Sequence, residues 1–187
     1  DKAADLLRSA DLPTLCARTG AELQEQCLIV PFFGTPCRID LPEIRFADPA
    51  PPMSEQILIL HYLTSTGSAK ARGEWVKFKN LPGASFYDPT YRKRSVDRIL
   101  AAFGSHPERL IQTAEALSGR QAGFGDAAIE VDVFPRIRAV VVLFGGDDEF
   151  PPEAGVLFQD DIVNFLPLED IAVCAGSLAG RLAKAAG

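Results

Sequence analysis

The stretch from Ala139 to Phe158 reads AVVVLFGGDDEFPPEAGVLF. Its first six residues are all apolar, a pattern that predicts a strand buried on both faces. Gly145 and Gly146 end this strand, and a second apolar run, Gly155–Phe158, follows two prolines and can pair beside it. The stretch therefore predicts two neighbouring strands joined by an acidic connection.

The acidic connection brings carboxylates to the edge of the predicted core. They are Asp147, Asp148, Glu149 and Glu153, and Asp160 follows the second strand. Carboxylate oxygens suit a hard cation such as calcium or magnesium, but the twelve-residue spacing of a calcium-binding helix–loop–helix motif is missing. Pro151 and Pro152 keep the residues before them extended. We interpret the connection first as a surface loop, and a carboxylate site for a divalent metal remains the alternative.

Further strands lie on both sides of this stretch. Ile129, Val131 and Val133 alternate with acidic residues, which is typical of a half-exposed strand. Near the other end of the chain, Cys27–Phe33 is apolar and contains Pro31, so it predicts a strand that is edged or broken at the proline. Strands in two groups with helices between them predict a single α+β domain over residues 1–187, with a mainly antiparallel sheet.

Three helices carry most of the remaining apolar residues. Ser54 is the expected cap of a helix that runs to about Thr64, with Glu55 in its first turn. This helix has almost no polar face, so it is a central helix. Residues 90–103 form an amphipathic stripe, and a final helix begins near Pro167 with Glu169 and Asp170 in its first turn.

Composition excludes several classes of function. The chain has 25 acidic and 19 basic residues, and its formal net charge of -6 disfavours binding to a nucleic-acid backbone. The basic group Arg92, Lys93, Arg94 and Arg98 is interpreted as the solvated face of a helix. No apolar run approaches the roughly 20 residues that span a bilayer. Four cysteines without a CxxC pair speak against zinc and cysteine-ligated clusters and indicate a reducing cytoplasm.

Two groups of side chains are candidates for a ligand site. His61 sits among apolar neighbours beside Tyr62, where a neutral imidazole is able to act as an axial ligand or general base. The alternative is a histidine at the edge of the core that is hydrogen-bonded to backbone. Aromatic residues with basic neighbours follow, and they predict either an apolar cleft for a flat ligand or a corner of the core. The predicted site consists of His61, Tyr62, Trp75, Phe78 and Tyr87.

Several segments together resemble a prokaryotic family known only as domain of unknown function 3786. They are ILILHYL (Ile57–Leu63), WVKF (Trp75–Phe78), LPGASFY (Leu81–Tyr87), GFGDAA (Gly123–Ala128), GDDEFPPEAGVLFQDD (Gly146–Asp161) and FLPLED (Phe165–Asp170). The resemblance covers nearly the whole chain. It implies an anaerobic setting, and the setting of some members implies corrinoid-related or methyl-transfer metabolism.

The function expected from this resemblance is a cytoplasmic module that binds a large cofactor, with a corrinoid (cobalamin-type) or another tetrapyrrole as the leading class. The DxHxxG pattern by which many corrinoid proteins supply a histidine ligand is absent from the sequence. Two other hypotheses stay open: a metal-dependent enzyme that uses the carboxylates of residues 147–153, and an adaptor for a redox or methyl-transfer protein partner. Whether the chain is an enzyme is left open by the sequence.

Overall fold

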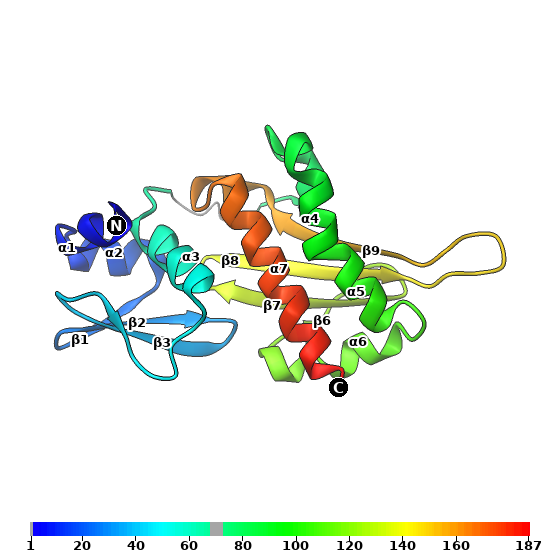
Figure 1. Cartoon of the computed structure of the whole chain (residues 1–187), viewed down its shortest axis with the longest axis horizontal. Helices are drawn as coiled ribbons and strands as arrows, with labels where there is room; N and C mark the ends of the chain where they lie inside the picture. Colours follow the sequence, from blue (N-terminus) through cyan, green and yellow to red (C-terminus); the bar gives the residue numbers. More distant parts are fainter. Residues whose placement is uncertain (1, 68–72) are drawn as a thin grey trace.

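The computed structural model describes residues 2–67 and 73–187, which fold into two antiparallel sheets and several helices (Figure 1). The first sheet has the order β1-β2-β3-β4 and is accompanied by α1 and α2. Its elements are α1 (Lys2–Arg8), α2 (Leu12–Thr19), β1 (Glu22–Gln24), β2 (Cys27–Phe32), β3 (Thr35–Asp40) and β4 (Arg45–Phe46).

The second sheet has the order β5-β9-β8-β7-β6, and its strands are β5 (Trp75–Lys77), β6 (Arg120–Gln121), β7 (Ala127–Phe134), β8 (Ile137–Phe144) and β9 (Glu153–Gln159). The remaining α-helices are α3 (Met53–Thr64), α4 (Asp88–Arg94), α5 (Val96–Phe103), α6 (Glu108–Gln112) and α7 (Leu168–Ala185). Short 3-10 turns cover Phe78–Asn80, Ala84–Tyr87, Glu115–Leu117 and Asp160–Asn164. The α+β class and the antiparallel pairing predicted from the sequence are confirmed.

Helix α7 crosses the five-stranded sheet with α3 on one side and α4 and α5 on the other (Figure 1). One continuous cluster of buried apolar side chains runs through both sheets and these helices, from Val30 and Ile59 to Val131 and Leu178. Burial of this size is the main stabilising term of such a fold. The packing fixes α7 between two helical walls, and this arrangement positions the site described below.

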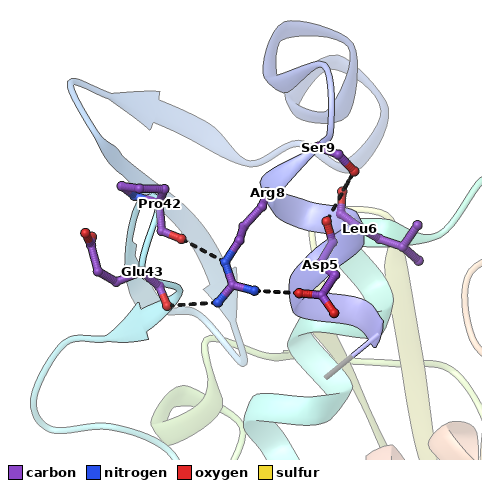
Figure 2. A network of polar contacts seen from close by, with 6 residues as sticks. All are labelled: Asp5, Leu6, Arg8, Ser9, Pro42 and Glu43. Carbon is purple, nitrogen blue, oxygen red and sulfur yellow. Dashed lines mark hydrogen bonds and ion pairs between the residues drawn. The ribbon is translucent and has the colours of Figure 1, made fainter.

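A polar network fastens α1 to the first sheet (Figure 2). The Arg8 guanidinium donates to the backbone carbonyls of Pro42 and Glu43, at 3.2 and 3.5 Å, and also to Asp5 at 2.7 Å. Because these groups are exposed, the network adds little to stability and mainly fixes the loop after β3.

The strands predicted at Ala139–Phe144 and Gly155–Phe158 are confirmed as β8 and β9, which pair directly. Pro31 lies within β2 beyond Ile29, the last β2 residue that pairs with β1, so it occupies an edge position on that side. This is where a strand tolerates a residue without an N–H group.

Two helix predictions were wrong in detail. Helix α3 begins at Met53 with Pro52 as its cap residue, so Ser54 lies inside the first turn and is not the cap. The stripe over residues 90–103 is divided at Ser95, whose side chain is buried and donates to the Tyr91 carbonyl at 2.7 Å. Ser95 has φ −122° and ψ −74°, which breaks the helix between α4 and α5. A serine bonded to its own helix competes with helical geometry in this way.

Candidate functional site

A buried carboxylate joins the start of α3 to the end of α7. Glu55 is 4% exposed, and both of its oxygens accept from the Arg181 guanidinium, one of them at 2.8 Å. Ser177, one turn earlier on α7, donates to the same carboxylate at 2.8 Å. Burial alone would raise the pKa of Glu55, but the hydrogen bonds and charge of Arg181 and the Ser177 bond outweigh it and lower the pKa.

Arg181 is also held by the first sheet. Its guanidinium carbon lies 4.6 Å from the ring centre of Phe33 and 5.1 Å from that of Phe32. Cation–π contacts of this kind favour a guanidinium at a fixed orientation. The carboxylate on one side and the two rings on the other leave Arg181 with little freedom to move.

The Glu55–Arg181 pair lies at the border of a surface groove of about 710 Å³ that runs along α7. One wall is the start of α3 and the other is formed by α4 and α5. The lining residues are Pro52, Ser54, Glu55, Arg94, Arg98, Ala172, Val173, Gly176, Ser177, Gly180, Arg181 and Lys184. We call this hollow the basic groove, because its lining contains four cationic side chains and one carboxylate.

Three of the four cations have no counter-charge within the described part of the chain. Arg94, Arg98 and Lys184 are exposed, and none of them forms an ion pair with a described residue. The carboxylate of the groove is already engaged by Arg181. A positive surface therefore exists on a chain whose net charge is -6.

Small residues form the floor of the groove. A β-carbon added at Gly180 would lie 3.3 Å from the nearest guanidinium nitrogen of Arg98, and one added at Gly176 would lie 3.6 Å from Arg94. The two glycines thus let α4 and α5 come close to α7 and bring both arginines over the floor. Ala172 and Val173 also line the groove.

His61 and Asp170 join the other ends of α3 and α7. Nδ1 of His61 lies 2.6 Å from Oδ2 of Asp170, and the His61 side chain is 38% exposed. Burial raises the pKa of Asp170, although the His61 hydrogen bond opposes this. The sequence offered a backbone partner as the alternative for His61, whereas the structure gives it a carboxylate.

The other four predicted site residues contact different partners. Tyr62 is fully buried, donates to the Thr19 carbonyl and stacks on Phe134 with ring centres 4.1 Å apart. Tyr87 is at the surface, and its hydroxyl donates to Glu169 at 3.3 Å. The structure does not gather the predicted site residues around one hollow.

The remaining two predicted site residues are Trp75 and Phe78, in the aromatic segment after α3. Trp75 lies on β5 beneath the Arg138 guanidinium, 5.8 Å from its carbon. Phe78 is buried and stacks on Tyr91 with ring centres 4.1 Å apart. Phe78 lines a separate pocket of about 210 Å³ together with Lys77, Lys79 and Arg92.

The acidic connection is the turn between β8 and β9, which extends away from the helices (Figure 1). Oδ1 of Asp147 accepts from the backbone N–H groups of Glu149 and Phe150 at 2.9 and 2.7 Å, and these bonds lower the pKa of Asp147. Across residues 2–67 and 73–187, no group of three or more His, Cys, Asp or Glu side chains is placed to hold a metal ion.

The sequence analysis missed the residues that build the basic groove. From the sequence, Arg94 and Arg98 are interpreted as a solvated helix face and Glu55 as a first-turn carboxylate, and no role is predicted for Arg181. A usable signal was present: a carboxylate in an otherwise apolar helix requires a buried cation, and Arg181 is the one arginine on the apolar final helix.

The comparison with protein families covers almost all of these elements. The chain matches the family described as domain of unknown function (DUF3786) over residues 11–181. The chain belongs to this family. The DUF3786 match includes both walls and the floor of the basic groove, apart from Lys184. No curated protein and no solved structure matches the chain. Among the described helices, none is long and apolar enough to cross a membrane.

Proposed function

We propose that this DUF3786 chain is a cofactor-binding module that holds a large, flat cofactor through anionic groups on its periphery in the basic groove, with a corrinoid or another tetrapyrrole as the leading class. The observation that carries the proposal is the convergence of Arg94, Arg98, Arg181 and Lys184 on one hollow. The proposal places the module in the cytoplasm.

The charges favour a ligand with several anionic groups. Arg94 and Arg98 extend from one wall, and Arg181 and Lys184 from α7, so the cations surround the floor on more than one side. Guanidinium groups bind carboxylates and phosphates through paired hydrogen bonds. A tetrapyrrole with carboxylates on its rim, or a corrinoid with its phosphate, matches this arrangement.

The shape of the groove favours a flat molecule. Its volume of about 710 Å³ lies in the range of ligand pockets, and its floor consists of small side chains. Because Arg94 and Arg98 already cover Gly176 and Gly180, a ring system would lie beside these arginines and not beneath them. In the described part of the chain no histidine lines the groove, so a corrinoid held there would be bound through its periphery.

Glu55 has a supporting role in this proposal. It holds Arg181 in one orientation before the ligand arrives, and preorganised groups bind at a lower entropic cost. It also reduces the positive charge of the groove, so its removal strengthens attraction to an anion while it frees the Arg181 side chain.

The experiment that tests this function is native mass spectrometry with absorbance spectra, before and after incubation with hydroxocobalamin or with uroporphyrin, which carries carboxylates around its ring. We expect a retained one-to-one adduct with a shifted spectrum for at least one of the two. A bare protein mass throughout, at ligand concentrations well above the protein concentration, would overturn the proposal.

A second candidate function is an adaptor that docks through the β8–β9 turn. Phe150 is 67% exposed and follows Asp147, Asp148 and Glu149, so an apolar side chain is presented within an acidic surface. Such a surface suits a basic protein partner with an apolar pocket, and its association would weaken with salt. If Phe150→Ser loses a co-purifying protein partner but still forms the cofactor adduct, the adaptor function is distinguished from the cofactor-binding function.

A further inference from the structure

Strand β9 has an open edge beyond the end of β5. The pairing of β5 with β9 runs from Trp75 opposite Gln159 to Lys77 opposite Leu157. After Lys77 the chain turns into Phe78–Asn80, and within residues 73–187 no strand continues along Glu153–Val156 on that side.

Backbone groups of Ala154 and Val156 face this open edge. Asp160 donates from its N–H to the Glu74 carbonyl at 2.9 Å, which shows that the even-numbered residues of this segment point toward β5. The Val156 carbonyl has the same orientation, because it accepts a hydrogen bond from the Tyr91 hydroxyl at 3.3 Å on this side of β9. The N–H and carbonyl of one strand residue point to the same neighbour, so the N–H of Val156 and both groups of Ala154 lie on the edge as well.

These groups open into the pocket of about 210 Å³ beside α4 and α5. Val156 is 1% exposed, and a buried N–H needs an acceptor. The pocket is lined by Lys77, Phe78, Lys79, Asp88, Tyr91, Arg92, Val96, Leu100, Pro152, Glu153, Ala154, Gly155 and Val156. Arg92 faces this pocket, whereas Arg94 and Arg98 face the basic groove, so α4 and α5 separate two hollows.

The pocket combines an apolar wall with charges. Phe78 and Tyr91 stack with an angle of 6° between their rings, and Val96 and Leu100 continue the wall. Burial raises the pKa of Tyr91 far above its ordinary value, so its hydroxyl remains a donor. Lys77, Lys79 and Arg92 supply positive charge, and Asp88 and Glu153 supply acceptors.

We infer that this pocket binds a carboxylate next to an amide, the chemistry of an N-acylated amino acid. The amide pairs with the edge of β9 at Ala154, the carboxylate meets Lys77, Lys79 or Arg92, and an apolar side chain lies against Leu100, the more accessible part of the apolar wall. A small acylated amino acid and the C-terminal residue of a peptide share this chemistry. The pocket is independent of the basic groove, and its ligand is a different one.

The inference is tested by NMR titration of the backbone amides with N-acetyl-leucine, its carboxamide, and a tripeptide ending in leucine. We expect saturable shifts at the Ala154 and Val156 amides with the free carboxylates and affinity at least about tenfold weaker with the carboxamide. Tighter binding of the tripeptide points to a peptide C-terminus, and equal binding points to the small molecule. No saturable shift with either carboxylate, or equal affinity for the carboxamide, overturns the inference.

Two matched pairs of variants locate the contact. Arg92→Ala should weaken N-acetyl-leucine binding about tenfold, whereas Arg94→Ala, which removes the same charge from the other face of α4, should leave it unchanged. Ala154→Pro deletes an edge N–H and should abolish the shifts in a folded protein, because its N–H does not pair with β8. Gly155→Pro is expected to unfold the strand, since its N–H faces β8. Equal effects of Arg92→Ala and Arg94→Ala would contradict the assignment.

Discussion

Helices α3 and α7 are joined by a buried carboxylate at each end of their contact, Glu55 with Arg181 and Asp170 with His61. At the first end a permanent cation and a hydroxyl lower the pKa of the carboxyl. At the second end the partner is a histidine, and burial raises the pKa of the carboxyl. Only the Glu55 end lines the basic groove. The difference is that the permanently charged end fixes an arginine at the basic groove, where we propose the ligand site, whereas the histidine end lies outside the groove.

The largest effect is expected from Arg181→Met. It leaves Glu55 buried without its cation, and breaking such a pair costs about 3 kcal/mol in the free energy of unfolding. Urea denaturation followed by circular dichroism measures the loss. The double variant Glu55→Leu with Arg181→Met should recover most of it, because apolar residues replace both charges. A single variant within about 0.5 kcal/mol of the wild type would show that the pair is not a structural link.

Glu55→Gln should cost about 2 kcal/mol at neutral pH, since the amide loses the charge that Arg181 and Ser177 meet. The direction in which this stability difference changes with pH follows from the lowered pKa of Glu55. The advantage of the wild type is fully present above about pH 4.3, the ordinary glutamate value, and is lost as pH falls through the lower folded-state pKa. Denaturation curves between pH 3 and pH 7 compare the two proteins. A difference that does not shrink on acidification would contradict the assignment.

Asp170→Asn should show the opposite trend and a smaller effect. Because the pKa of Asp170 is raised in the folded protein, its ionised form costs stability at neutral pH, and the wild type gains stability as pH falls through that raised value. We expect the variant to be more stable by about 0.5 to 1 kcal/mol at pH 7, with the gain vanishing toward about pH 3.9. A loss of about 2 kcal/mol or more at pH 7 would mean that the His61 contact outweighs the burial of Asp170.

The smallest effect is expected for cofactor binding in His61→Ala. The sequence alone predicts that this variant weakens binding, because it treats His61 as an axial ligand. The basic groove predicts unchanged binding, since His61 does not line it. Absorbance titration of wild type and variant with hydroxocobalamin distinguishes the two, and unfolding curves of the same samples show whether the variant is folded.

The fold was accessible from the sequence where the pattern is local. The apolar run at Ala139–Phe144 and the alternation at Ile129–Val133 predict their strands correctly. In both, the order of apolar and polar residues directly reflects which side chains are buried. The break between α4 and α5 at Ser95 is not predicted, because the hydrogen bond from the buried Ser95 hydroxyl to the Tyr91 carbonyl does not change the pattern of apolar residues.

The site was less accessible because its parts are far apart in the chain. Glu55 and Arg181 are separated by 126 positions, and no local spacing reports that they meet. The sequence favours His61 as a site residue because histidine is rare and chemically versatile. Its partner Asp170 lies 109 positions away in the chain, so the contact between them is not predicted. Tyr62 and Phe78 were assigned to a ligand site, and each is buried against another aromatic ring. An aromatic residue that builds the core has the same local pattern as one that lines a cleft.

The most direct measurement of the central claim is the affinity for uroporphyrin, by calorimetry, of two charge-matched double variants. Arg94→Ala with Arg98→Ala removes two cations from the groove, and Arg92→Ala with Lys93→Ala removes two neighbouring cations outside it. We predict that the first pair lowers affinity by at least about tenfold and reduces its salt dependence, while the second pair changes it less than about threefold. Equal losses in both variants, or no loss in the first, would contradict a ligand site in the basic groove.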